Sequence, residues 1–201
     1  MARKNEELRW QLTAGILKRL HLESLSQRYN HTWVMAGFNF VNGSLSIALI
    51  SLLALVTQEA FIFPSLGATA FILFYAPLAS AASPRNAFYG HLVGALSGLT
   101  ALHIFGLQHA PSAMETGVDV HRVGAAALSL GATSSLMILL RVGHPPAGAT
   151  ALIVSLGLMP QLGQLPVLMG GVTLLLLQAF ITNRLAGIAY PKWQAHRGEA
   201  T

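Results

Sequence analysis

Two proline-led segments with the same small residues carry most of the chemistry that this sequence offers. The segments 64–73 and 145–154 lie 81 residues apart and share six of ten positions, including a Gly-Ala-Thr-Ala run. Proline suits the first turn of a helix, where its missing N–H would have no partner in any case. Each segment is therefore predicted to begin a helix, with unpaired N–H groups and a partial positive charge at its start.

Two such helix starts favour a small anion as ligand, because the N–H groups donate hydrogen bonds and the dipole attracts negative charge. Glycine lets a ligand approach the backbone, and threonine adds a hydroxyl donor. Each end contributes about 0.3–2 kcal/mol, which suits passage better than tight storage. The binding residues predicted in the two segments are Pro64, Ser65, Gly67, Ala68, Thr69, Pro145, Pro146, Gly148, Ala149 and Thr150. Backbone N–H groups near Gly67, Ala68, Gly148 and Ala149 are expected to supply most of the contacts.

Four further polar residues complete the predicted binding site, namely Arg85, Asn86, His91 and His144. A polar ring at a helix start inside a membrane is energetically costly and is typical of a functional residue, so His144 is predicted to supply charge or gating. His91 fits a pathway and a hydrogen-bonded packing role equally well. Arg85 and Arg141 both end apolar stretches, where snorkelling to the membrane surface competes with a direct role.

Metal and enzyme chemistry find little support. The chain has eight histidines, but none stand three or four residues apart as in a HExxH site. There is no cysteine and no GxSxG elbow. We therefore predict no metal, no cofactor and no enzymatic activity.

The composition indicates the class of protein that holds these residues in place. Of 201 residues, 53% are hydrophobic and only 9% are charged, against about 25% charged in a soluble domain. This excludes disorder and a large soluble catalytic domain. The formal charge of +5 suggests nucleic acid, but the basic residues lie toward the two chain ends. That placement favours a membrane surface and no nucleic acid partner.

The predicted fold is all-α, a polytopic bundle of membrane helices. Basic residues and a helical leucine pattern mark 1–32 as an amphipathic cytoplasmic segment on the inner leaflet, or as a solvated helical tail. A single transmembrane domain over 33–190 and a cytoplasmic tail over 191–201 follow. The apolar stretches cover 37–56, 65–80, 87–107, 123–140, 147–159 and 165–189.

Two of these stretches, 65–80 and 147–159, are short for a hydrocarbon core of about 30 Å. Both follow a proline, so half-helices or broken helices that begin inside the membrane are expected. The repeated motif divides the domain into repeat 1, about 37–107, and repeat 2, about 122–190. Three elements in each repeat predict an inverted relation between them, as in transporters.

Charge placement predicts the orientation. With both termini in the cytoplasm of a bacterial inner membrane, six crossings place Arg85 and Arg141 inside and the loop with Glu115 and Asp119 outside. Only Arg122 disagrees with that rule. Re-entrant short stretches would leave four crossings and reverse the positions of Arg85 and the acidic loop.

A row of glycines follows Arg85. Gly90, Gly94 and Gly98 form a doubled GxxxG pattern, which lets another helix approach closely. This pattern fits both helix packing within the monomer and contact between subunits. We retain a homo-oligomer through this face as a hypothesis.

The motifs also resemble a known family. Gly-His-Pro-Pro-Ala-Gly-Ala-Thr-Ala over 143–151 resembles the motif that names the HPP family of integral membrane proteins. The segment 64–70, Ala76-Pro77, Pro84-Arg85-Asn86 and Gly90-His91 also resemble that family, over about residues 33 to 190. The family is described as having four spans. Members in chloroplasts and cyanobacteria are associated with nitrite transport, and other members are joined to regulatory CBS domains.

From these observations we expect a transporter or channel for a small monovalent anion, with nitrite first among them, in a lipid bilayer. A membrane-embedded regulatory or interaction protein without flux is the alternative. A channel for a neutral small solute is a variant of the first expectation.

Overall fold

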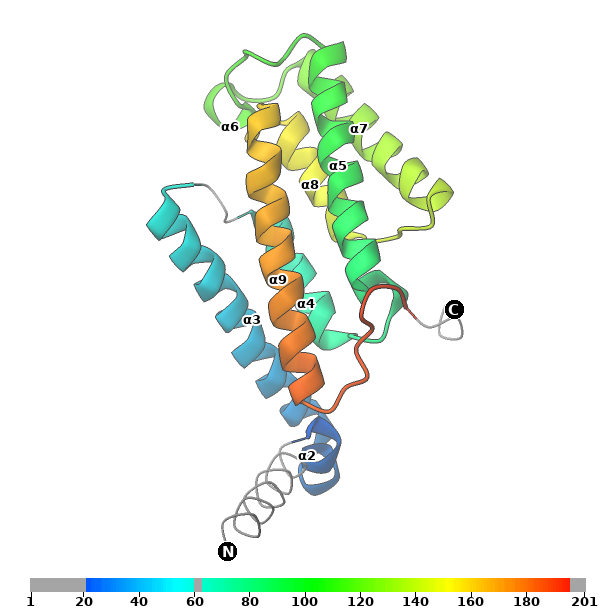
Figure 1. Cartoon of the computed structure of the whole chain (residues 1–201). Helices are drawn as coiled ribbons and strands as arrows, with labels where there is room; N and C mark the ends of the chain where they lie inside the picture. Colours follow the sequence, from blue (N-terminus) through cyan, green and yellow to red (C-terminus); the bar gives the residue numbers. More distant parts are fainter. Residues whose placement is uncertain (1–20, 60–62, 196–201) are drawn as a thin grey trace, which may run out of the picture.

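The computed structural model describes residues 21–59 and 63–195, and within these ranges it contains helices and their connections but no strand (Figure 1). The predicted all-α fold is thus confirmed for the described part of the chain. Most of the predicted N-terminal segment 1–32 lies outside the described residues. Its described part holds a short helix, α2 (Leu22–Arg28), beside the first long helix.

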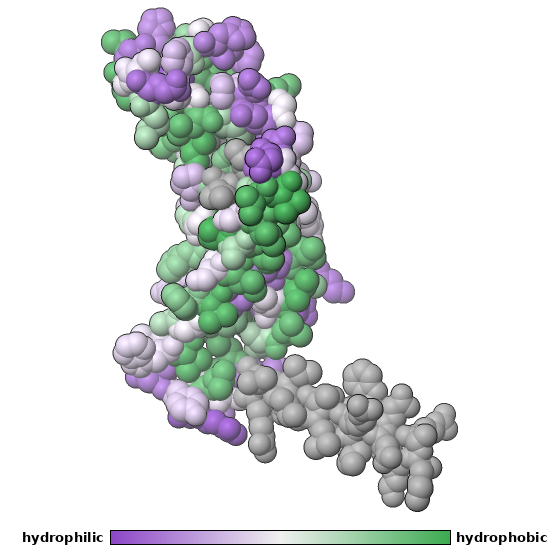
Figure 2. Space-filling view, turned by 90° about the vertical axis from the view of Figure 1, so that its left-hand side faces the viewer, coloured by the Kyte–Doolittle hydropathy of each residue, from purple (hydrophilic) through white to green (hydrophobic). Residues whose placement is uncertain are grey.

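Four helices are long and apolar enough to cross a bilayer. They are α3 (His31–Thr57), α5 (Pro84–Ile104), α7 (Val120–Leu139) and α9 (Leu165–Leu185). About 20 residues at 1.5 Å each span a hydrocarbon core of about 30 Å. Apolar side chains cover the middle of the face in Figure 2, and hydrophilic ones gather mainly toward its ends. The chain is built as an integral membrane protein.

Two helices are too short to cross. They are α4 (Pro64–Tyr75) with 12 residues and α8 (Pro146–Ser155) with 10, which reach about 18 and 15 Å. Each has proline in its first turn. Both begin in the interior of the bundle and run in opposite directions, α4 toward the end that carries α2 and α8 toward the end that carries α6 (Figure 1).

Six complete crossings, which charge counting favoured, are therefore not what the chain forms. The direction of the six helices nevertheless alternates along the chain (Figure 1). The Arg85 guanidinium donates to the Arg141 carbonyl at 2.8 Å, so these two arginines share one end of the bundle, as predicted. The acidic segment lies at the opposite end, around α6 (Ala113–Thr116).

The order of helix lengths repeats along the chain as long, short, long. The last helices of the two sets begin 81 residues apart, α5 at Pro84 and α9 at Leu165. In each set the outer helix packs on the short helix of its own set, α3 on α4 and α7 on α8. An inverted symmetry relation between the sets remains a prediction.

Short elements join the helices. A 3-10 turn, η1 (Ser80–Ala82), precedes α5, and another, η2 (Leu162–Gln164), precedes α9. The Ser83 hydroxyl accepts from the Asn86 N–H at the start of α5, and the Asp119 carboxylate accepts from the Arg122 N–H at the start of α7. Both are N-caps that satisfy otherwise unpaired amides.

The glycine row on α5 is a packing face within the chain. A Cβ on Gly90 would lie 2.7 Å from the His144 Cβ, and one on Gly94 would lie 2.4 Å from the Ala147 carbonyl oxygen. A Cβ on Gly98 would lie 2.6 Å from the Val154 Cβ. The subunit contact hypothesised through this face is wrong in its location, because α8 already covers it.

The two ends of the bundle differ in charge. The Leu22 N–H donates to the Ala186 carbonyl and the Arg85 N–H donates to the Trp193 carbonyl, so both described chain ends lie at the end that holds Arg85. At the other end, hydrogen bonds from the Ser112 side chain and then from its backbone N–H lower the pKa of the Glu115 carboxyl. Glu115 therefore keeps its negative charge there.

Candidate functional site

A buried junction forms where the two short helices begin. It consists of four side chains: Thr69 on α4, His91 on α5, His144 just before α8, and Thr150 on α8. None is more than 1% exposed. All four were predicted as binding residues, and the structure brings them together from three helices and one connection.

His91 joins the two threonines of the repeated motif. Its Nε2 lies 2.8 Å from the Thr69 Oγ1, and its Nδ1 lies 2.7 Å from the Thr150 Oγ1. The two hydroxyls occupy equivalent positions 81 residues apart. One imidazole ring thus links the two halves of the chain at their equivalent points.

His144 completes the junction from the other side. Its Nε2 lies 3.0 Å from the Thr69 Oγ1, and its Nδ1 lies 2.7 Å from the Ala81 carbonyl oxygen in η1. The ring centroids of His91 and His144 are 5.0 Å apart. The Thr69 hydroxyl therefore contacts both imidazoles, and it also lies 3.0 Å from the Ser65 carbonyl one turn earlier in α4.

Small residues let these groups approach. Gly90 leaves room for the His144 Cβ, so the connection before α8 reaches the backbone of α5 one residue from His91. Proline at 145 and 146 then starts α8 at once, and Thr150 follows one turn later on the same face as Pro146. The spacing of the His-Pro-Pro motif thus places His144 and Thr150 on either side of His91.

Ser65 adds an unused donor beside the junction. It lies in the first turn of α4, is 1% exposed, and its hydroxyl has no hydrogen-bond partner among the described residues. An unpaired buried hydroxyl costs free energy, so this group is available to a ligand.

The other predicted residues of the two motifs lie differently. Pro64, Gly67 and Ala68 are on the exposed face of α4, and Pro145 and Ala149 are exposed near the start of α8. Pro146 and Gly148 are buried, but the Gly148 N–H already donates to the Pro145 carbonyl at 3.0 Å. At the junction the side chains, rather than the expected backbone amides, present the polar groups.

Arg85 and Asn86 position the connections around the junction. The Arg85 guanidinium donates to the carbonyls of Leu140 and Arg141, at the end of α7. The Asn86 amide donates to the Ser80 carbonyl at 3.0 Å and, at 3.5 Å, to that of Gly143. Asn86 therefore ties η1 to the residue before His144.

Arg122 has a role that sequence reasoning missed. It disagreed with the charge rule, yet its side chain is 2% exposed and donates to the carbonyls of Ser155, Pro111 and Ala110 at 3.1, 2.7 and 3.4 Å. Ser155 is the last residue of α8, so Arg122 caps the negative end of that helix. The sequence did contain a signal for this role, because Arg122 lies at the end of its span where the positive-inside rule does not expect a basic residue.

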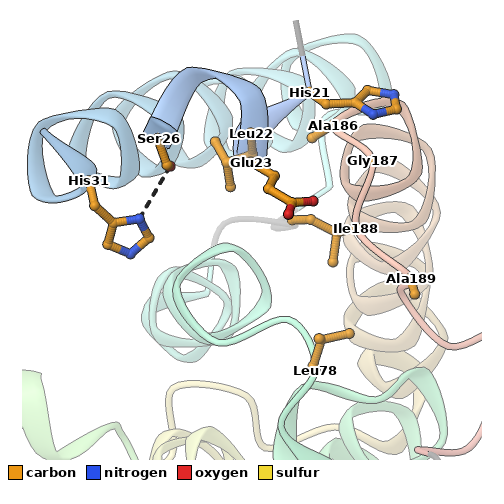
Figure 3. A pocket seen from close by; sticks show the side chains of 10 residues that line it. All are labelled: His21, Leu22, Glu23, Ser26, His31, Leu78, Ala186, Gly187, Ile188 and Ala189. Atoms are coloured by element: carbon orange, nitrogen blue, oxygen red, sulfur yellow. Dashed lines mark hydrogen bonds between the residues drawn. The ribbon is translucent and has the colours of Figure 1, made fainter. Parts of the chain in front are cut away.

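A cavity lies at the end of the bundle that holds both described chain ends (Figure 3). It has a volume of about 400 Å³ and is lined by α2, the start of α3 and the segment after α9. Glu23 points into it, and the His31 ring contacts the Ser26 hydroxyl at 3.2 Å. A carboxylate makes this cavity unsuited to an anion, and it is separate from the junction.

A metal site would need several ligand side chains close together. Across residues 21–59 and 63–195, no three His, Cys, Asp or Glu side chains come together as metal ligands would. The junction pairs its two imidazoles with hydroxyls instead. The contacts at the junction are hydrogen bonds.

Comparison with known proteins gives one match. Residues 10–191 match the family model described as HPP, transmembrane region. No curated protein and no solved structure matches the chain.

Proposed function

Since the chain belongs to the HPP family of transmembrane proteins, we propose that it is a transporter or channel for a small monovalent anion, with nitrite as the first candidate. The observation that carries this proposal is the junction itself. Two half-helices begin there, and four buried hydrogen-bonding side chains meet between them. Nitrite comes first because other members of the family are associated with its transport.

The electrostatics of the junction favour negative charge. The first turns of α4 and α8 each present the positive end of a helix dipole, worth about 0.3–2 kcal/mol. Neither the four long helices nor the two short ones contain Asp or Glu. A cation pathway would need such carboxylates near mid-membrane.

The side chains divide the work of binding. Thr69 and Thr150 hydroxyls donate to the anion when they release His91, and the unused Ser65 hydroxyl adds a third donor. His91 and His144 supply N–H donors and gate the pathway, because their mutual contacts through Thr69 close it. Arg85 acts through the end of α7, as a positioning residue.

The closed junction describes one state of a transport cycle. All four side chains are buried and bonded to one another, so an anion enters only when these bonds open. Exchanging internal hydrogen bonds for bonds to an anion has a small net free energy, because each donor keeps a partner. Such a small binding free energy suits an anion that passes through the protein and is not held tightly.

We further propose that the protein resides in a bacterial inner membrane with both termini in the cytoplasm. The end of the bundle with Arg85, Arg141 and both described chain ends then faces inward, as the positive-inside rule requires. We assign it no enzymatic activity and no nucleic acid partner.

The test is nitrite flux into sealed proteoliposomes at controlled pH and membrane potential. The wild-type protein is compared with His144→Ala and with His103→Ala as a matched control. His103 lies on α5 away from the junction, where its ring bonds only the Leu99 carbonyl. We expect flux above that of empty liposomes, a loss of at least tenfold in His144→Ala, and wild-type flux in His103→Ala.

The outcomes separate the alternatives. Absence of flux from folded wild-type protein contradicts the proposal and favours a regulatory or interaction role without transport. Flux that other small anions fail to compete with favours a channel for a neutral solute. Equal flux in wild type and His144→Ala removes the junction from the pathway.

A further inference from the structure

The junction contains one more hydrogen-bond contact than it has polar hydrogens when both imidazoles are neutral. The contacts are Thr69 with Ser65 O, Thr69 with His91, Thr69 with His144, His91 with Thr150, and His144 with Ala81 O. Every such contact needs one hydrogen. Two threonine hydroxyls and two neutral imidazoles bring one hydrogen each, so four hydrogens serve five contacts.

The two backbone carbonyls fix the direction of the bonds, because a carbonyl only accepts. His144 must carry its hydrogen on Nδ1 to reach the Ala81 carbonyl, which leaves Nε2 as an acceptor. Thr69 has a single hydrogen and two acceptors that compete for it, the His144 Nε2 and the Ser65 carbonyl, both at 3.0 Å. Whichever acceptor receives the hydrogen, the other contact has none.

The remaining ring has one consistent tautomer. His91 donates from Nε2 to Thr69, and its Nδ1 accepts the Thr150 hydroxyl. With the reverse tautomer Thr69 would have to donate to His91, and two contacts would then lack a hydrogen. The neutral junction is thus a chain with one direction, from Thr150 through His91 and Thr69 to His144.

One added proton on His144 completes every contact. The Nε2–H then donates to Thr69, and Thr69 turns its own hydrogen to the Ser65 carbonyl. Thr69 accepts from both rings and donates once, which is the full capacity of a hydroxyl. The same proton placed on His91 leaves one of the two Thr69 acceptors without a hydrogen.

We propose that the junction binds one proton, on His144 Nε2, as the positive partner of the anion; this inference rests on the proposed function. The proton comes from solvent, no covalent bond other than N–H forms, and the anion and proton together are neutral. The Ser65 hydroxyl, which has no partner among the described residues, then donates to the anion, and Thr150 does so only when its hydroxyl releases His91.

No other charge at the junction takes this role. Among the described residues, α4 contributes only Tyr75 at its far end, and α8 and η1 contribute no titratable group. On α5 the titratable groups are Arg85, Tyr89, His91 and His103, and α7 carries His121 and Arg122 in its first turn and is followed by Arg141. The Tyr190 hydroxyl reaches η1 from the segment after α9, where it donates to the Ala82 carbonyl. The Arg85 guanidinium bonds the carbonyls at the end of α7, and Arg141 is exposed.

The experiment follows the imidazole nitrogens of the full chain, labelled with ¹⁵N-histidine in bilayers, through a pH titration. Nitrogen shifts distinguish the two neutral tautomers from the doubly protonated ring, and His91→Asn and His144→Gln assign the signals. On acidification we expect His144 to become doubly protonated while His91 still carries one hydrogen on Nε2. Protonation of His91 first, or of both rings together, would overturn the proposal.

Two variants and one ligand sharpen the result. Thr69→Val removes the acceptor of the added hydrogen and should weaken proton binding at His144 at least tenfold, about one pH unit. Thr133→Val is the matched control, because Thr133 is equally buried but its hydroxyl bonds only the Ser129 carbonyl within α7. An equal shift in both variants would contradict the role of Thr69.

Sodium nitrite is then compared with sodium gluconate at equal concentration. We expect nitrite to strengthen proton binding at His144 at least tenfold, because each charge favours the other. A titration that ignores nitrite would overturn the pairing of proton with anion. Failure of the proposed function is recognised separately, as absent nitrite flux in proteoliposomes.

Discussion

The two half-helices occupy equivalent places but are held very differently. The row Gly90, Gly94 and Gly98 on α5 brings that helix into close contact with α8. The positions 81 residues later on α9, which packs on α4, are Gly171, Leu175 and Ala179. Two of the three positions thus carry larger side chains, and one face of α4 is exposed. From this comparison we infer that α8 is the more firmly held half of the junction and α4 the half that moves.

Gly94→Ala should have the largest effect, because its Cβ would lie 2.4 Å from the Ala147 carbonyl oxygen and the backbone of α8 would have to shift. Gly67→Ala on α4 is the matched variant, since a Cβ there meets nothing within 4 Å. We expect Gly94→Ala to lose about 3 kcal/mol of unfolding free energy and Gly67→Ala to lose almost none. Unfolding in detergent measures both, and equal losses would remove the asymmetry.

Substitutions that remove a cap from the end of a half-helix should have the second largest effect on the unfolding free energy. Arg122→Ala removes three bonds to carbonyls around the end of α8, and we expect a loss of about 2–3 kcal/mol. Asn183→Ala removes the single bond to the Leu73 carbonyl near the end of α4, worth about 1 kcal/mol. The same unfolding assay applies. A larger loss in Asn183→Ala would make α4 the more firmly held helix.

Hydrogen exchange compares the two helices without mutation. If α4 is the half that moves, its amides open more often than those of α8. We expect the α4 amides to exchange about tenfold faster than those of α8, equivalent to about 1.4 kcal/mol of opening free energy. Mass spectrometry of peptides from each helix measures this, and faster exchange in α8 would reverse the assignment.

The smallest effects are expected at the turns that follow the half-helices. The Tyr190 hydroxyl donates to the Ala82 carbonyl at 2.7 Å, beside the Ala81 carbonyl that His144 uses. Burial raises the pKa of Tyr190, so it remains the neutral donor. Tyr190→Phe should cost about 1 kcal/mol, and Gln164→Ala in the exposed η2 turn a few tenths, at about 0.3 kcal/mol. Unfolding midpoints rank the two, and a larger loss in Gln164→Ala would contradict this ranking.

Local signals predicted much of the fold. Hydropathy located all six helices, and proline marked the starts of α4 and α8 because its ring fits only the first turn. The number of membrane crossings, four or six, was ambiguous in the sequence. Positive charges indicate on which side a connection lies, while helix length decides whether a segment crosses. Here the directions alternate and two segments are short, so each argument was correct about a different property.

The candidate site was predicted in its residues more than in its contacts. The repeat identified Thr69 and Thr150, and the His-Pro-Pro motif identified His144. That His91 lies between both hydroxyls depends on how closely α5 and α8 approach, which is a tertiary property. The same packing turned Arg85 and Arg122 into caps for carbonyls at helix ends, and no spacing along the chain records that.

The bridge made by His91 also has a consequence for the two sides of the membrane. An imidazole has two unlike nitrogens, one donating and one accepting, so it cannot treat two equivalent hydroxyls alike. Thr69 receives a hydrogen from it and Thr150 gives one to it. Because His91 lies where the two similar halves meet, the position of one hydrogen atom makes the two halves different. For the transporter proposed above, we therefore expect opening toward one leaflet and opening toward the other to differ in free energy, with one side preferred in the unoccupied protein.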